Sequence, residues 1–163
     1  MTEVEDSGEA QLAVRNLEKT FQSGDSPLPV LCGVDLNMQA GDQLAVTGPS
    51  GSGKSTLLYI IGTLDQPSVG TVTINGEDPF SRDETGLAKF RNSQIGFIFQ
   101  DHHLLPQCTV LENVLVPLLA SSGPATADEE RAMNLLGRVG LADRRDHLPS
   151  RISGGERQRV AVC

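Results

Sequence analysis

Short apolar stretches separated by turn residues fill the first hundred positions of the chain. Alternating apolar and polar side chains are the pattern of a half-buried strand, and a short unbroken apolar run is the pattern of a buried one. The run at 43–47 leads directly into glycines and is predicted to be a buried strand. Five segments are predicted as strands: 11–15 (QLAVR), 34–38 (VDLNM), 43–47 (QLAVT), 71–75 (TVTIN) and 94–99 (QIGFIF).

Turns and helices are predicted between and after these strands. Residues 23–29 (SGDSPLP) and the pair Asn75-Gly76 carry turn chemistry. Residues 54–64 are apolar on most sides, as in a helix that packs on a sheet, and a short helix is predicted around 85–91.

From position 101 onward the pattern becomes helical. Thr109 with Glu112, and Thr126 with Glu129, fit the capping box that opens a helix. The second helix is predicted to end at Gly140. Its apolar face consists of Ala132, Leu135, Leu136 and Val139.

These patterns divide the chain into four parts. We predict an acidic disordered tail at 1–10, an α/β core at 11–100, a mostly helical subdomain at 101–152, and the start of a further helix at 153–163. A chain of 163 residues has the size of one domain.

Composition and charge exclude several classes of protein. Thirteen Lys and Arg against twenty-one Asp and Glu give a net charge of -8, which argues against a nucleic-acid partner. The three cysteines lie far apart, so neither a disulfide framework nor a zinc site is indicated. The acidic N-terminus does not have the pattern of a secretory signal, and the apolar run at 114–120 is too short for a direct membrane span.

The segment 48–56 reads GPSGSGKST and fits the phosphate-binding pattern G-x-x-x-x-G-K-[ST] between a strand and a helix. Its glycines allow backbone N–H groups to surround an anion, and the helix dipole favours negative charge at the same place. The alternative is a plain Gly-Ser connection with a solvated Lys54. The predicted contacts are Gly48, Pro49, Ser50, Gly51, Ser52, Gly53, Lys54, Ser55 and Thr56.

A second glycine turn lies near the end of the chain, where residues 152–158 read ISGGERQ. Ser153 and Glu156 fit a capping box, which needs no ligand. The N–H groups of Gly154 and Gly155 at a helix N-terminus are also suited to an anion. Both interpretations can hold together.

The two glycine segments together resemble the phosphate loop and the LSGGQ signature of ABC ATPases. Phe21 in LEKTF matches the aromatic that stacks on adenine in that family, and Gln100 in GFIFQ matches the Q-loop glutamine. Without the resemblance, Phe21 would be a core aromatic and Gln100 a polar residue at a strand end. The resemblance covers 11–163 and implies an α/β P-loop NTPase core: a parallel sheet, N-terminal antiparallel strands and a helical subdomain.

The resemblance also implies an ATPase mechanism. ATP would bind between two ATPase subunits docked head to tail. Lys54 and its loop would hold the phosphates, and Ser55 and Gln100 would hold Mg2+. Ser153 and the neighbouring Gly154, Gly155 and Glu156 would meet the γ-phosphate across the dimer, and Lys54 and Gln100 would serve catalysis. A membrane permease would be the partner, with the chain cytoplasmic and peripheral on the inner face of the membrane.

Within the family, residues 100–120 and 152–162 resemble the lipoprotein-release and macrolide-export branch most. ABC ATPases carry an Asp-Glu strand and a switch histidine after the signature, and neither is found here. The chain therefore resembles a C-terminally truncated domain, in which the strand at 43–47 lacks its usual neighbour. Two alternatives are a non-catalytic nucleotide-binding fragment and a soluble ABC protein of DNA repair or translation. His102, His103 and His147 are predicted to be solvated or partner-facing rather than metal ligands.

Overall fold

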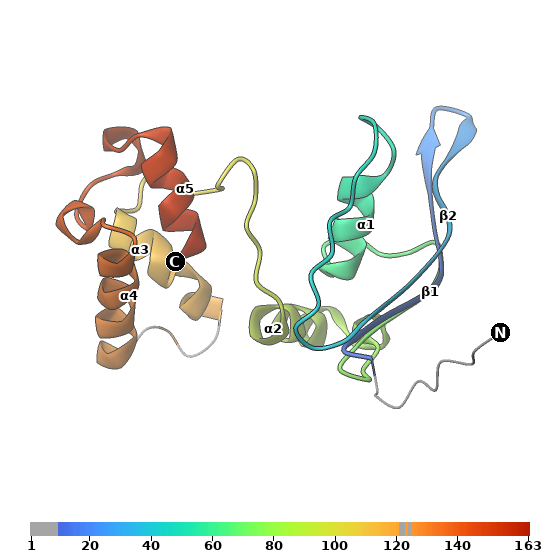
Figure 1. The fold of residues 1–163 in the computed structure, drawn as a ribbon, viewed down its shortest axis with the longest axis horizontal. Helices are drawn as coiled ribbons and strands as arrows, with labels where there is room; N and C mark the ends of the chain where they lie inside the picture. Colours follow the sequence, from blue (N-terminus) through green and yellow to red (C-terminus); the bar gives the residue numbers. More distant parts are fainter. Residues whose placement is uncertain (1–9, 121–122, 124) are drawn as a thin grey trace. The chain divides into compact units, whose positions relative to one another are not determined.

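The structure is a computed structural model that describes residues 10–120, 123 and 125–163. The chain divides into two compact units, one ending at Ser93 and one comprising Gln94–Cys163, and each is described by itself (Figure 1). Nearly all of the predicted tail at 1–10 lies outside the described residues. The predicted domain boundaries at 100 and 152 stay predictions.

The first unit is built on a three-stranded antiparallel sheet in the order β2-β1-β3. The strands are β1 (Leu12–Ser23), β2 (Ser26–Met38) and β3 (Val69–Ile74). A tight turn at Gly24 joins β1 and β2 into the long hairpin seen in Figure 1. The predicted strands at 11–15, 34–38 and 71–75 are thus confirmed, although the hairpin strands run further than the alternation alone indicated.

One face of this sheet forms the core of the first unit. Val14 and Leu17 of β1 and Val72 of β3 are fully buried together with Ile60 of α1 (Lys54–Ile61). Burying side chains of this size stabilises a fold by about 1.5–3 kcal/mol each. The core therefore fixes α1, and with it the loop that precedes it, against the hairpin.

Two predicted strands are wrong in the described structure. Neither 43–47 nor 94–99 forms strand ladders, and Leu44 and Ile98 are 51% and 65% exposed. A strand persists only where a neighbour satisfies its N–H and C=O groups. Among the described strands none pairs with these two segments, so the predicted parallel sheet is not formed by the described residues.

The predicted short helix is present as α2 (Glu84–Gln94), after a single 3-10 turn η1 (Pro79–Ser81). Asp78 caps that turn by accepting a hydrogen bond from Phe80 N at 2.9 Å. Arg91 of α2 donates to the carbonyl oxygen of Thr63 at 2.6 Å, just past the end of α1.

The described part of the second unit is helical. It contains α3 (Val110–Leu115), α4 (Thr126–Arg138) and α5 (Gly154–Val162), with the 3-10 turns η2 (Val116–Ala120), η3 (Ala142–Arg144) and η4 (Pro149–Arg151) between them. Helix α4 ends before Gly140, as predicted. The buried core of this unit is Val110, Leu136, Leu141, Ile152 and Val160.

The two predicted capping boxes have different outcomes. Thr109 and Glu112 form theirs at the start of α3. The second prediction was one residue out, because α4 already includes Thr126 and its N-cap is Ala125. The Asp128 carboxylate accepts a hydrogen bond from Ala125 N at 2.9 Å, so the acid three residues after the true N-cap decides where the helix begins.

None of the helices in the described part of the chain has the length and apolar character needed to cross a lipid bilayer.

Candidate nucleotide site

The glycine loop connects the unpaired segment 43–47 to α1. Gly51 and Gly53 adopt left-handed backbone angles, with φ of 79° and 85°. A Cβ added at Gly53 would lie 2.9 Å from Val30 O and 3.0 Å from Leu31 Cδ2, so the loop packs closely on β2. Only glycine fits both the angle and the space.

Lys54 is the first residue of α1 and folds back over the loop. Its ammonium group donates to the carbonyl oxygens of Gly48 at 3.0 Å and Pro49 at 2.6 Å. An ammonium group has three N–H donors, so one remains for a further acceptor. The positive charge therefore lies at the glycine loop rather than extending into solvent.

The N-terminus of α1 has no side-chain cap. Within the described residues no acceptor is found for the N–H groups of Lys54 and Ser55. Open first-turn N–H groups and the helix dipole create positive potential there. Lys54 adds to this potential, an arrangement that suits an anion and is unfavourable without one.

Ser55 presents an exposed hydroxyl on the first turn of α1. A hydroxyl oxygen is a hard ligand of the kind that Mg2+ accepts together with phosphate oxygens and water. No group of three or more His, Cys, Asp and Glu in the described ranges could hold a metal ion.

Phe21 lies on β1 near the tip of the hairpin, opposite Leu28, and is 39% exposed. The alternative interpretation, that Phe21 is a core aromatic, would require a buried ring. The Lys19 ammonium lies 4.9 Å from the centre of the Phe21 ring. An exposed ring in the same unit as the glycine loop is suited to stacking, and its role as an adenine platform stays a prediction.

Gln100 belongs to the second unit. It is exposed and follows the segment whose Phe97 and Phe99 rings stack at 5.3 Å. His103 packs edge-on against Phe99 at 4.6 Å. Contact between Gln100 and a metal at the glycine loop stays a prediction.

The second glycine segment has the predicted capping box. Ser153 Oγ accepts from Glu156 N at 3.3 Å, and Glu156 Oε2 accepts from Ser153 N at 2.7 Å. Gly154 and Gly155 are exposed in the first turn of α5. The capping alternative is correct, and among the described residues no acceptor is found for the N–H groups of Gly154 and Gly155.

Sequence reasoning missed the residue that supports this turn. Arg157 donates from Nη1 to Pro149 O at 3.2 Å and to Ile152 O at 3.1 Å, which ties α5 to the loop before it. An arginine four residues after an N-cap serine can reach back over the first turn, which is the signal that could have found it.

The two capping carboxylates predict a loss of stability in acid. The hydrogen bond from Ser153 N–H, followed by that from the Ser153 side chain, holds the pKa of Glu156 below its ordinary 4.5. Thr109 lowers the pKa of Glu112 in the same way. Groups with a lowered folded pKa contribute stability above 4.5, and that contribution is lost as pH falls through the folded pKa.

We therefore expect the melting temperature of Glu156→Gln to depend less on pH below 4.5 than that of the unmodified chain. The glutamine keeps an acceptor oxygen but does not titrate. Thermal melts at a series of pH values measure this. Glu130→Gln, an exposed site within α4, is the matched control and should keep the original pH dependence. Equal slopes for both variants would contradict the assignment.

Comparison with known proteins identifies the family to which this chain is similar. The family model described as "ABC transporter" matches residues 31–163. The lipoprotein-releasing system ATP-binding protein LolD 1 of Rhodopirellula baltica is 54% identical over 93% of this chain and 66% of its own length. LolD of Geobacter metallireducens is 50% identical over 93% of this chain and 68% of its own length. The chain thus spans about two thirds of these relatives.

The solved structures to which this chain is similar belong to the same family. The dimeric post-hydrolysis structure of the ATP-binding cassette MJ0796 bound to ADP and Pi has a TM-score of 0.85 at 38% identity, over 93% of this chain and 67% of that one. A further dimeric structure of MJ0796, titled a bacterial ABC transporter cassette, has a TM-score of 0.81 at 39% identity, with the same shares covered. The predicted fold class, a P-loop NTPase core, is confirmed. With a left-handed glycine loop, a lysine folded over it and a family match over most of its length, the chain belongs to the ABC transporter family of ATP-binding domains.

Proposed function

We propose that this chain binds ATP as the nucleotide-binding part of an ABC transporter ATPase subunit. The observation that carries the proposal is the loop at 48–53, whose left-handed glycines and folded-back Lys54 place positive charge at the open start of α1. A triphosphate would give Lys54 anionic oxygens in place of neutral carbonyl oxygens, so that both the donor and the acceptor of each hydrogen bond would be charged. Family membership supports ATP as the nucleotide.

The roles of the other residues belong to the same proposal. Ser55 would hold Mg2+ with Gln100, and Mg2+ would neutralise charge on the outer phosphates. Phe21 would stack on adenine. Ser153, Gly154 and Gly155 would donate to the γ-phosphate of ATP bound by a second subunit docked head to tail. Glu156 would act indirectly, since its bond to Ser153 N fixes the turn that carries those donors.

We propose further that ATP hydrolysis drives a membrane permease partner, with the chain peripheral on the cytoplasmic face of the membrane. The relatives named as lipoprotein-releasing ATP-binding proteins support lipoprotein release in particular. The dimeric MJ0796 structures support pairing of two ATPase subunits.

Calorimetric titration with ATP, ADP and AMP in the presence of Mg2+ tests nucleotide binding. The affinity should fall by about tenfold or more from ATP to AMP, because each lost phosphate removes charge-assisted hydrogen bonds worth about 1.5–3 kcal/mol. Similar affinities for ATP and AMP would contradict the proposal, as would the absence of heat with ATP at millimolar concentration. Release of inorganic phosphate in the same samples tests hydrolysis.

A further inference from the structure

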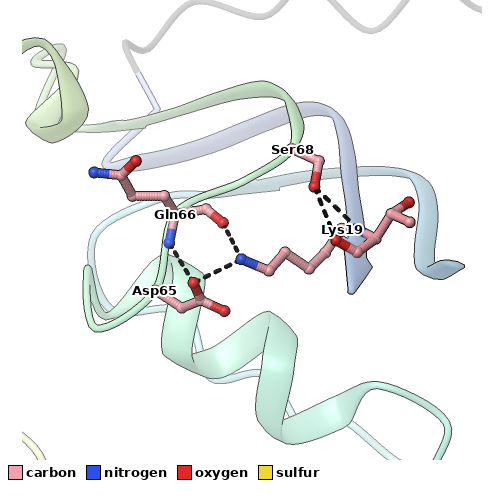
Figure 2. Close-up of polar contacts among 5 residues, drawn as sticks. Lys19, Asp65, Gln66 and Ser68 are labelled. Carbon is pink, nitrogen blue, oxygen red and sulfur yellow. Dashed lines mark hydrogen bonds and ion pairs between the residues drawn. The ribbon is translucent and has the colours of Figure 1, made fainter. Parts of the chain in front are cut away.

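Lys19 is an unusually covered lysine for a position on a hairpin. Its side chain is only 13% exposed, whereas lysine normally keeps its charged end in water. Its ammonium group donates to Asp65 Oδ1 at 2.6 Å and to Gln66 O at 2.7 Å (Figure 2). A lysine this covered is tolerated because a carboxylate and a carbonyl oxygen satisfy it.

The partners of Lys19 belong to the segment that follows α1. Asp65 also accepts from Gln66 N at 2.8 Å, which fixes the carboxylate in place. Ser68 continues the contact along β1, because its N–H donates to Glu18 O at 2.8 Å and its Oγ accepts from Thr20 N at 3.1 Å. The segment after α1 therefore forms hydrogen bonds with β1 on both sides of Lys19.

The N-terminal end of α1 packs against the same hairpin. Gly53 approaches Val30 and Leu31 of β2 so closely that a methyl group would not fit, and Leu31 is the register partner of Lys19. Contacts at both ends of α1 thus converge on one short stretch of the hairpin. This arrangement fixes the distance between the phosphate loop and the hairpin residues next to Lys19.

Phe21 is the exposed aromatic two residues beyond Lys19. The ammonium of Lys19 lies over the ring, 4.9 Å from its centre. A cation over one face of a ring is attracted by the ring's quadrupole, and this attraction favours the ring orientation in which the two groups meet. The structure thus links the charge of Lys19 to both the end of α1 and the orientation of Phe21.

We propose that Lys19, held by Asp65, is a positioning residue that orients Phe21 to stack on the purine base of a nucleotide whose phosphates lie at the glycine loop. This inference rests on the proposed function. It predicts that Lys19 affects the recognition of the base and leaves the recognition of the phosphates unchanged.

The test compares ATP with inorganic tripolyphosphate, which has the phosphates and no base. Calorimetry on Lys19→Met should give about three- to tenfold weaker ATP binding, the scale of a cation–π contact, with tripolyphosphate binding unchanged. Lys89→Met, an exposed lysine of α2, removes the same charge and should alter neither ligand. Asp65→Asn keeps an acceptor for Gln66 N–H but loses the charge, and should repeat the selective loss.

A double substitution tests the route through Phe21. Phe21→Leu alone should weaken ATP binding by about five- to a hundredfold, the range for stacking of a base on an aromatic ring. Lys19→Met added to Phe21→Leu should weaken ATP no further, since the group through which Lys19 acts is gone.

Two results would overturn the inference: equal losses for ATP and tripolyphosphate in both Lys19→Met and Asp65→Asn, or fully additive losses with Phe21→Leu. Either would make Lys19 a purely structural residue. Failure of the unmodified chain to bind ATP or tripolyphosphate would instead contradict the proposed function itself. Thermal melts of every variant separate a folding defect from a selective change in affinity.

Discussion

Replacing Lys54 by alanine should weaken ATP binding by about 10- to 100-fold, because a charged donor contributes about 1.5–3 kcal/mol per hydrogen bond and Lys54 has at least one to give. Lys54 already lies at the loop, with contacts to Gly48 O and Pro49 O. Little side-chain ordering is then needed when phosphate oxygens take the place of these carbonyls. The loss should be larger for ATP than for AMP.

The matched control for this substitution is Lys89→Ala. Lys89 is an exposed lysine in the same unit, so its removal changes the net charge equally without touching the loop. Calorimetry on the two variants with ATP and Mg2+ measures the difference. Equal affinities for Lys54→Ala and the unmodified chain, with both proteins folded, would mean that the loop does not hold a triphosphate.

Gly70→Ala should cause a large loss of stability in the first unit. Gly70 lies at the start of β3 with φ of 91°, and a Cβ there would lie 2.3 Å from Asn16 O and 2.5 Å from Arg15 O. The left-handed angle costs about 1–2 kcal/mol for an L-residue, and the overpacking adds about 1–3 kcal/mol. The backbones of β1 and β3 must move away from each other to admit the methyl group.

In a unit of the size of Met1–Ser93, each kcal/mol shifts the melting temperature by roughly 4–8 °C. Gly70→Ala should therefore lower the melting temperature by about 10 °C or more. Gly24→Ala is the control for the backbone angle alone, because Gly24 has φ of 61° and no atom within 4 Å of an added Cβ. It should cost about 1–2 kcal/mol. Equal shifts in thermal melts of the two variants would show that the contact with β1 carries no energy.

Sequence alone predicted the elements whose signals are local. The alternation at 11–15 and 71–75, the capping residues Thr109 and Ser153, and the glycine loop each depend on side chains within a few residues of one another. Local backbone preferences and first-turn hydrogen bonds therefore suffice to place them. The N-cap of α4 is Ala125, one residue before the predicted Thr126, because Asp128 rather than Glu129 accepts the capping hydrogen bond.

Where the answer depended on distant partners, the sequence was insufficient. The apolar runs at 43–47 and 94–99 have the composition of strands, yet a strand also needs a neighbour, and neither run has one among the described strands. Lys19 and Asp65 are 46 positions apart, so no local pattern could pair them. The sequence by itself determined the glycine loop and the capping boxes at Thr109 and Ser153, because their chemistry is contained in short segments. Only the tertiary structure decided which apolar runs became strands and which charges met, because hydrogen-bond ladders and buried ion pairs are properties of chain segments brought together by folding.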